Sequence, residues 1–580
     1  MASFTSYLLA FGLSWLALTS CAQSARGAST TSPVSKAASQ ATTSSSLITL
    51  TPRQVDNVAA LGQVWGFLKY FHPAVAAGQR DWDADLLRQL PAILACRSVA
   101  DRSQVLSTWI TSLGAVPACR SCATVPAQPV YLSPDLAWAQ DTKRFDAPLR
   151  QQLAFIVANR YQGSPYYVST APAGNPVFTH EEAYADQVCP IQGLRLLAVC
   201  RYWSMVQYFY PYKEANWAAV LPDLLPHFAA ADTPLGYRHA ALMLFARLRD
   251  GHATLRDPLL EAEQGNYLVA AALQFIDDQA VVLRVRHDGL VPQPPLEPGD
   301  IITHLDGTPV AQLVAQRLPE TPGSNRAAQL RTVALNLLYG TTPQVNLQVV
   351  RAGKTLQVVA PRFKIGTVPP VRPVVADSMY RFLTPTVGYI DIARITKAKL
   401  PVLLQAFRHT QGIVIDLRAY PGEFVTRELP GYFLAQPTPF VQYTFFDPSC
   451  PGRFLTSPVD ILYPQGDLPY AGRLVVLVNE SALSQAEYTA MALRATPHCI
   501  LLGSPTAGAD GNVSRLVLPG NVVTALSGIG IYYPDGRATE RIGLVPDMAI
   551  RPTPAGLRAG KDELRERAVE LIRQTSTEVH

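Results

Sequence analysis

Hydrophobic positions along the chain change their spacing twice, and these changes divide the sequence into regions. From residue 51 to about 260 apolar side chains recur at helical spacing, so this part is expected to be mostly α-helical. From about 265 to 360, short alternating apolar runs are separated by Gly, Asp-Asp and Pro turns, which is typical of β-strands. From about 378 to 552, apolar runs alternate with helical patterns, which favours an α/β sheet with crossover helices.

The helical region contains a repeated pattern. The segment "WGFLKYFHP", which begins at Trp65, resembles "WSMVQYFYP", which begins at Trp203, and "DWDADLLRQLP" resembles "NWAAVLPDLLP" at a similar offset. We interpret this as a duplicated helical unit in which each copy buries its aromatic residues. The second copy ends in "FARLRDGHATL", with His252, whereas the first ends in "ITSLGAVPACRSC" and has no His. If only the second copy has acquired a catalytic residue, that residue is expected at this end of the copy.

Two serines lie where a buried strand is followed by a helix, in "VLVNESALSQAEYTAMALRA" from Val476 to Ala495. Ligands of α/β sheets bind at such strand ends. The free N–H groups and the dipole at a helix N-terminus also favour negative charge there. Serine before a helix most often caps it, so one of Ser481 and Ser484 is expected to be a cap. The other is then available for chemistry.

Composition narrows the classes of function. The 580 residues are 48% hydrophobic and 16% charged, which indicates several well-packed domains and not a disordered chain. The formal net charge is +5, and no Lys/Arg block stands out, so nucleic acid is a poor candidate partner. Neither a metal-binding HExxH motif nor a P-loop is present, so we expect no metal and no nucleotide cofactor.

The N-terminus indicates export. Residues 1–21 read as a signal peptide whose boundary "LTSC" resembles a bacterial lipobox, so Cys21 would be acylated and anchor the protein to a membrane surface. Ordinary cleavage nearby with free secretion is the alternative. Residues 22–50 are a Ser/Thr-rich linker. We expect a location in the cell envelope, such as the bacterial outer membrane, or secretion.

Export makes disulfides possible. Cys119-x-x-Cys122 lies in a Pro-punctuated loop, and no second pair follows at zinc spacing. A local disulfide is therefore favoured over a metal knuckle.

Six segments together resemble the S41 serine peptidases, a family of tail-specific or C-terminal-processing proteases and tricorn-like relatives. They are "RDGHATL", "LEPGDIITHLDGTPV", "IVIDLRAYPG", "VLVNESALSQAE", "LLGSPTAGA" and "GRATERIGLVPD", and they span roughly residues 240 to 552. The second segment resembles the PDZ signature. The resemblance implies a multidomain α/β fold with a helical domain (51–262), a PDZ-like β-rich domain (263–365) and a ClpP/crotonase-like α/β catalytic core with a C-terminal helix (366–580).

The family resemblance also selects the nucleophile. In that family the nucleophilic Ser precedes a Glu by three positions, and Ser484 stands in this relation to Glu487 whereas Ser481 does not. The Lys of the processing proteases aligns with Ala509, and the chain has no Lys anywhere between residues 399 and 561. A Ser–Lys dyad of that kind is therefore not available.

The tricorn-like branch instead uses a His before the PDZ-like region and a Glu after the Ser. The resemblance then implies a triad of Ser484, His252 and Glu540. The chemistry is coherent, since neutral imidazole can take the proton of a Ser hydroxyl and a carboxylate can hold the imidazole. His409 and His498 are rival bases, and Asp535 and Asp547 are rival acids.

Acyl transfer needs hydrogen-bond donors for the oxyanion. The backbone N–H of Gln485 is one natural donor, and the family resemblance implies Gly422 as the second. The family has a Gly-Gly pair there, whereas this chain has Glu423 after Gly422, which brings the geometry of the turn into question.

The sequence thus predicts an exported, membrane-tethered serine endopeptidase that hydrolyses peptides or unfolded polypeptide tails. The alternative is a catalytically inactive peptide-binding scaffold on the same fold. A hydrolase of other acyl compounds is less favoured, because the GxSxG elbow of α/β-hydrolases is absent around Ser484.

Overall fold

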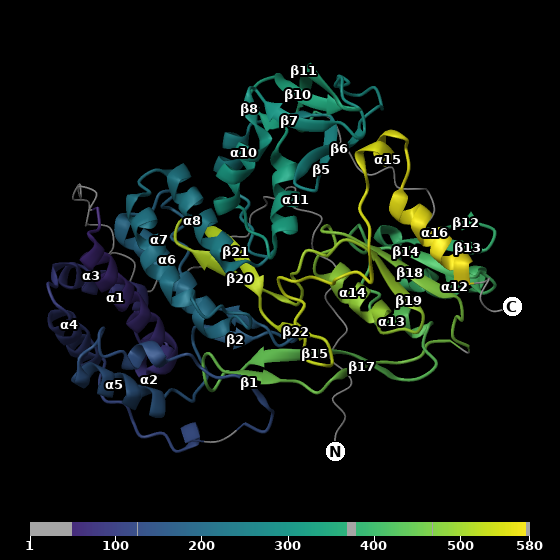
Figure 1. Cartoon of the computed structure of the whole chain (residues 1–580). Helices are drawn as coiled ribbons and strands as arrows, with labels where there is room; N and C mark the ends of the chain where they lie inside the picture. Colours follow the sequence, from purple (N-terminus) through teal and green to yellow (C-terminus); the bar gives the residue numbers. More distant parts are fainter. Residues whose placement is uncertain (1–48, 124–125, 368–378, 467, 576–580) are drawn as a thin grey trace, which may run out of the picture.

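The computed structural model describes residues 49–575 except 124–125, 368–378 and 467. The predicted signal peptide with Cys21, and nearly all of the predicted linker, lie outside the described residues. The whole is a mixed α/β multidomain fold, as the hydrophobic pattern predicts. Figure 1 shows the helical region on the left, a β-rich unit at the top and an α/β core on the right.

The helical region is built around two central helices, α1 and α6. Both are buried along most of their length and on every side, which is typical of helices inside a core. The region contains α1 (Pro52–Phe71), α2 (Pro73–Ala76), α3 (Trp82–Ala95), α4 (Val99–Ser112), β1 (Val130–Leu132), α5 (Ala147–Ala158), β2 (Val168–Thr170), β3 (Pro176–Phe178), α6 (Gln192–Phe209), α7 (Val220–Ala230), α8 (Pro234–Leu248) and α9 (Pro258–Gln264).

Two buried tryptophan pairs have the same geometry. Trp65 donates its indole N–H to the carbonyl of Trp82 at 2.9 Å, and Trp82 donates to the carbonyl of Trp65 at 3.1 Å. Trp203 and Trp217 exchange the same two bonds at 3.0 and 3.2 Å. These pairs occupy corresponding positions in the two copies that the sequence suggests.

The β-rich unit is one sheet with two helices. The strand order is β5-β6-β7-β10-β11-β4-β9, with β8 beside β7, so β5 is an edge strand, and α11 packs against it. Its elements are β4 (Tyr267–Val269), β5 (Ala271–Ile276), β6 (Gln279–Val285), β7 (Ile301–Leu305), β8 (Thr308–Pro309), α10 (Val310–Arg317), α11 (Arg326–Asn336), β9 (Tyr339–Gly340), β10 (Gln344–Arg351) and β11 (Lys354–Lys364).

The core sheet has the order β12-β13-β14-β18-β19-β23 and is parallel from β13 onwards. Helices α12 and α14 cover one face and α16 the other. The elements are β12 (Tyr380–Thr384), β13 (Val387–Asp391), α12 (Leu400–Phe407), β14 (Gly412–Asp416), α13 (Glu428–Gly431), β15 (Thr438–Phe446), β16 (Phe454–Thr456), β17 (Asp460–Leu462), β18 (Arg473–Val478), α14 (Gln485–Arg494), β19 (Cys499–Gly503), β20 (Val513–Leu518), β21 (Val522–Ser527), β22 (Gly530–Tyr532), β23 (Met548–Ala549), α15 (Pro554–Arg558) and α16 (Glu563–Thr575).

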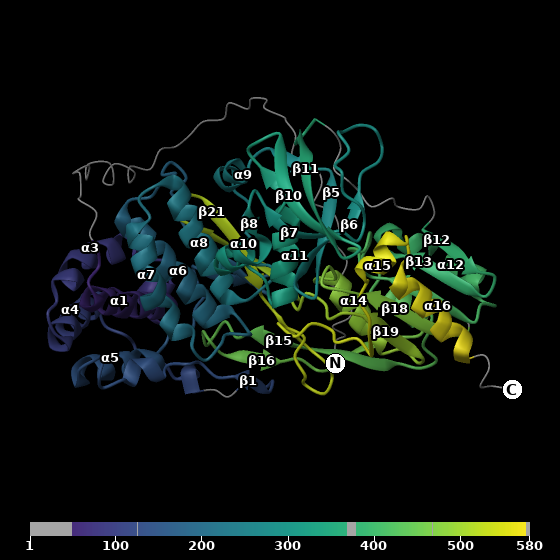
Figure 2. The same cartoon turned by 45° about the horizontal axis from the view of Figure 1, so that its top comes forward.

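The hairpin β20–β21 joins the core to the helical region. In Figures 1 and 2 it lies beside α6 and α8, far from the parallel sheet. Its apolar side chains, among them Leu516 and Leu526, are buried in the same hydrophobic cluster as α1 and α6. The hydroxyl of Tyr237 also donates to the carbonyl of Pro519 at 2.7 Å. The helical region and the core therefore share one hydrophobic interior.

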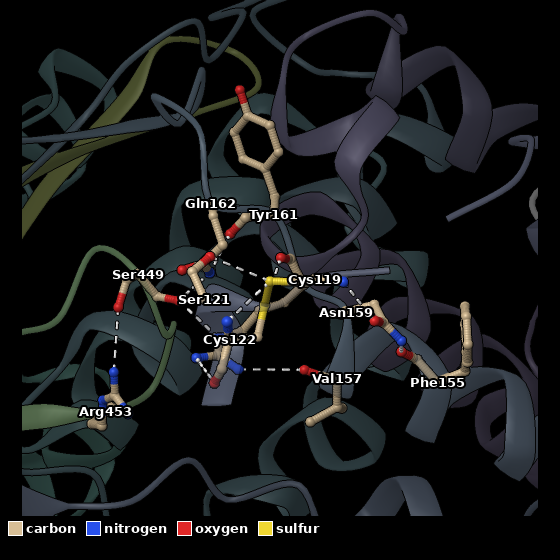
Figure 3. The surroundings of a disulfide bond; sticks show 11 residues. Cys119, Ser121, Cys122, Phe155, Val157, Asn159, Tyr161, Gln162, Ser449 and Arg453 are labelled. Carbon is tan, nitrogen blue, oxygen red and sulfur yellow. Dashed lines mark hydrogen bonds between the residues drawn. A yellow bond between two sulfur atoms is a disulfide. The ribbon is translucent and has the colours of Figure 1, made fainter. Parts of the chain in front are cut away.

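Cys119 and Cys122 form a disulfide, as the sequence favours (Figure 3). The carbonyl of Cys122 accepts a hydrogen bond from the guanidinium of Arg160 at 3.0 Å, and Arg160 also donates to the carbonyl of Ser449 at 2.8 Å. The disulfide loop is thereby tied to the core. Among the described residues, no helix has the length and apolar composition that a membrane span requires.

A buried ion network connects α1, α3 and α6 with Glu181. The carboxylate of Glu181 accepts hydrogen bonds from Lys69 at 2.6 and 2.8 Å and lies 3.0 Å from the Arg201 guanidinium, which also pairs with Asp83. The side chains of Lys69 and Arg201 are at most 1% exposed. Burial lowers the pKa of Lys69, and the charge of Glu181 opposes that effect. Glu181 is therefore needed to balance two buried cations.

We expect Glu181→Ala to destabilise the protein by about 3–5 kcal/mol, because it leaves buried Lys69 without its carboxylate partner and Arg201 with Asp83 alone. The matched control is Glu570→Ala, which removes the partner of Arg567 in an exposed pair on α16 and should cost at most about 1 kcal/mol. Thermal unfolding followed by circular dichroism measures both. Equal effects of the two changes would contradict the assigned role of Glu181.

Candidate active site

Ser484 lies between the end of β18 and the start of α14, in a strained backbone conformation. Its φ is 55° and its ψ is −118°, a region that non-glycine residues rarely adopt. Such conformations cost about 1–3 kcal/mol and occur mainly where the surrounding structure enforces them. Strained strand-to-helix turns of this kind expose the nucleophilic Ser of other hydrolases. The Ser484 N–H donates to the carbonyl of Ala509 at 2.8 Å, which fixes the turn.

The carboxylate of Glu487 holds this turn from inside. It is fully buried and accepts four hydrogen bonds: from the Thr506 hydroxyl, and from the N–H groups of Gly508 at 2.8 Å, Ala509 at 3.0 Å and Ser484 at 3.3 Å. Burial raises the pKa of Glu487 to about 7, although all four hydrogen bonds act to lower it. Glu487 therefore joins the first turn of α14 to the loop 506–509.

His252 is held by a neighbouring carboxylate and a hydroxyl. Its Nδ1 lies 3.3 Å from Oδ1 of Asp250 and 3.0 Å from the hydroxyl of Ser527. Asp250 also accepts from the backbone N–H of His252 at 2.8 Å and of Ser527 at 2.7 Å. Burial would raise the pKa of Asp250, but the hydrogen bonds from His252 and Ser527 outweigh it and hold the pKa below its ordinary value.

The other ring nitrogen of His252 is left available. Nε2 is buried and has no hydrogen-bond partner among the residues that the structure describes. With Nδ1 directed to Asp250 and Ser527, a neutral imidazole carries its free lone pair on Nε2, as a general base requires.

The loop that carries His252 packs on the turn that carries Ser484. A Cβ atom at Gly251 would come within 3.2 Å of the side chains of both Leu483 and Ala509. Gly251 therefore permits a close approach that any larger residue would hinder. The structure thus brings the Ser484 turn and the His252 loop, 232 positions apart in the sequence, into direct contact.

Glu540 lies nearby, but the predicted contact with the His252 ring is replaced by others. Its Oε1 accepts from the hydroxyls of Ser324 at 3.3 Å and Tyr210 at 3.5 Å, and its Oε2 has no partner in the described part of the chain. Asp250 takes the place beside the imidazole, because it precedes His252 by only two residues in the same tight loop. Burial, and next the charge of Asp250, raise the pKa of Glu540 well above its ordinary value.

The predicted oxyanion donors are both engaged in this structure. The N–H of Gly422 donates to the carbonyl of Ile392 at 2.9 Å. The hydroxyl of Tyr420 interacts with the Ser484 side chain and with the backbone N–H of Gln485. Tyr420 is 54% exposed, so its ring lies at the surface with the hydroxyl directed at the serine. The tyrosine hydroxyl therefore lies close to both Ser484 and the expected oxyanion donor of Gln485.

The rival residues lie elsewhere. His409 and His498 are exposed, and Asp535 is in an exposed turn beside Arg537. Asp547 accepts from the N–H of Leu501 at 2.8 Å and so supports β19. Where the chain is described, no group of three or more His, Cys, Asp or Glu side chains is arranged to hold a metal ion.

Sequence reasoning did not single out Asp250, Ser527 or Tyr420. Asp250 could have been found from the sequence, because an Asp side chain in a turn commonly accepts a hydrogen bond from the backbone N–H two residues later, which here belongs to His252. Ser527 is 275 positions from His252, and no local pattern could connect them.

The chain was compared with known protein families and curated proteins. Residues 386–550 match the model of peptidase family S41. This segment includes Ser484 and Glu540, whereas Asp250 and His252 precede it. The carboxy-terminal-processing protease of Bartonella bacilliformis (strain ATCC 35685 / KC583 / Herrer 020/F12,63) is 23% identical over 288 residues, which are 46% of this chain and 58% of that protein. The match therefore spans little more than half the length of this curated relative.

Solved structures share the fold. Mature CPAF complexed with lactacystin superimposes with a TM-score of 0.52 at 12% identity, covering 66% of this chain and 99% of that one. A second crystal structure of mature CPAF gives a TM-score of 0.51 at 13% identity, covering 66% and 98%. At these identities the likeness concerns the fold alone.

The raised pKa of Glu487 predicts a pH-dependent stability. A carboxyl whose pKa is higher in the folded state contributes fully below its unfolded pKa, and the contribution is lost as the pH rises through about 7. The free energy of unfolding, wild type minus Glu487→Gln, should therefore fall by up to about 1.4 kcal/mol per pH unit between about pH 4.5 and 7. Urea denaturation across that range measures it. A difference that does not vary with pH would show that Glu487 does not titrate there.

Proposed function

We propose that the protein is an exported serine endopeptidase that hydrolyses peptides or unfolded polypeptide tails through an acyl-enzyme. The observation that carries this proposal is the strained Ser484 at a strand end, with the loop of His252 packed directly on its turn. The match of the core to a peptidase family supports it.

In the proposed reaction the Ser484 hydroxyl attacks the scissile carbonyl, and Nε2 of His252 accepts its proton. Asp250 and Ser527 hold Nδ1, so the ring keeps its orientation, and the Asp250 charge stabilises the imidazolium. His252 then gives the proton to the leaving amine, and water hydrolyses the ester formed on Ser484. General-base assistance of this kind contributes about 10²–10⁴-fold in rate.

The oxyanion needs a rearrangement of the turn before Gly422. A substrate carbonyl that uses the Gln485 N–H replaces the Tyr420 hydroxyl there. Recruiting Gly422 as a second donor requires its N–H to leave the carbonyl of Ile392. Since losing one oxyanion donor costs about 10²–10³-fold in rate, this turn controls much of the expected activity.

Glu540 supports the site without touching the imidazole. Burial raises its pKa well above the ordinary value, and its partner Ser324 also accepts from the N–H of Gly251. We assign to Glu540 the support of the loop that carries His252.

The β-rich unit is the proposed substrate-presenting module. Its segment "LEPGDIITHLDGTPV" resembles the PDZ signature. The edge strand β5 offers a place for an extended peptide to add as a further strand. The side chain of Gln274 on β5 donates to Glu480 at 2.6 Å, four residues before Ser484. A peptide along β5 would thus lie near the candidate active site. Anchoring through acylated Cys21 is part of the same proposal.

We expect Ser484→Ala to abolish both cleavage of an unstructured polypeptide such as casein and labelling by a fluorophosphonate, with unchanged thermal stability. Retained cleavage would exclude Ser484 as nucleophile. A wild-type protein that binds C-terminal peptides but neither cleaves them nor reacts with the probe would instead support an inactive peptide-binding scaffold. One observation favours this second function: the Gly422 N–H donates to the carbonyl of Ile392, so in this structure it is not available to bind an oxyanion.

Replacing each carboxylate by the amide of the same shape distinguishes the role of Asp250 from that of Glu540. We expect Asp250→Asn to lower kcat by about 10²–10⁴-fold, because it removes the charge that stabilises the imidazolium. Glu540→Gln should lower kcat much less, since Glu540 contacts Ser324 and Tyr210 and not the imidazole. Steady-state kinetics of both variants measure the difference, and the reverse order would make Glu540 the orienting acid.

A further inference from the structure

The start of α11 reaches from the β-rich unit into the candidate active site. Helix α11 packs against β5, and residues 323–325 precede it. Ser324 is fully buried and Asn325 is half-buried. Both side chains make hydrogen bonds to loops that belong to other regions of the chain.

Ser324 connects the His252 loop to Glu540. Its hydroxyl oxygen accepts from the N–H of Gly251 at 2.7 Å, and its O–H donates to the carboxyl of Glu540 at 3.3 Å. A buried hydroxyl that is used as both acceptor and donor has one defined orientation. Removing it would leave the Gly251 N–H without its acceptor, next to His252.

Asn325 divides its side chain between two functions. Its Oδ1 accepts from the N–H of Ala328 at 2.9 Å and so caps α11. Its Nδ2 donates to the carbonyls of Thr506 and Ala507, both at 3.0 Å. The oxygen of the side chain therefore binds the first turn of α11, and its nitrogen binds the loop 506–509.

The loop 506–509 is the one that fixes the nucleophile. Its Ala509 accepts the Ser484 N–H, and three of its groups donate to Glu487. In the part of the chain that the structure describes, no hydrogen bond joins the His252 loop directly to the Ser484 turn at Gly251, whereas hydrogen bonds from the start of α11 reach the supports of both. The relative position of base and nucleophile thus depends in part on a third region of the chain. The core adds one bridge of its own, because Arg541 donates its backbone N–H to the carbonyl of Gly508 at 2.7 Å and its Nε to that of Arg249 at 3.3 Å.

We propose that Ser324 and Asn325 are positioning residues, which set the His252 loop and the Ser484 turn at reactive distance from the β-rich unit. The proposal rests on the peptidase function proposed above. Neither residue touches the substrate in this role. Because a misplacement of about 1 Å can cost about 10²-fold in rate, small shifts of these loops are sufficient to matter.

The test uses Asn325→Ser, because Ser also caps helices but is too short to reach the two carbonyls. We expect kcat on casein, and the rate of fluorophosphonate labelling of Ser484, to fall about tenfold or more with KM little changed. Ser324→Ala should act in the same way. The matched control is Thr332→Ala on α11, whose hydroxyl bonds only within the helix, to the carbonyl of Ala328.

The outcomes separate this proposal from the peptidase assignment. Lower labelling and kcat, with a thermal midpoint like that of Thr332→Ala, support the positioning role. Unchanged rates, or a loss that merely follows the unfolded fraction, overturn it while the peptidase assignment stands. A wild-type protein that neither cleaves casein nor labels overturns both.

Discussion

A buried carboxylate that receives four hydrogen bonds fixes the geometry on which the candidate site depends. Glu487 lies in the first turn of α14, where the helix N-terminus already favours negative charge, and its donors come from two segments. The strained backbone of Ser484 is enforced by this arrangement, because its N–H is shared between Glu487 and the carbonyl of Ala509. Ser484 is at the same time the N-cap residue of α14, so the cap expected of one of the two serines falls on the candidate nucleophile itself.

The rest of the site is assembled from all three regions of the fold. The helical region supplies His252 and Asp250, the core supplies Ser484, and the β-rich unit supplies the side chains that hold their loops. Ala509, which the family resemblance places at the position of a Lys in the processing proteases, provides a backbone carbonyl and a small side chain. The small side chain at that position admits the loop of Gly251, and the base that we propose, His252, comes from a different part of the chain.

Local patterns predict local geometry well in this protein. The apolar run that ends at Val478 and the helical pattern after Ser484 define the strand-to-helix turn, and the alternation of strands and helices predicts the parallel sheet. The partner of His252 is different, because it depends on how a loop folds back on itself. A resemblance between sequences favours Glu540, whereas the short distance along the chain places Asp250 at the ring. Contacts such as that of Ser527 are set by tertiary packing and leave no mark in the sequence.

The hairpin β20–β21 gives the architecture a further property. Its last residue, Ser527, binds the imidazole, and its strands are buried among the helices of the N-terminal region. A chain whose helical region has not yet collapsed around this hairpin therefore lacks both the base and the group that orients it. In the peptidase proposed above, hydrolytic competence therefore requires the helical region and the core to have packed together around this hairpin.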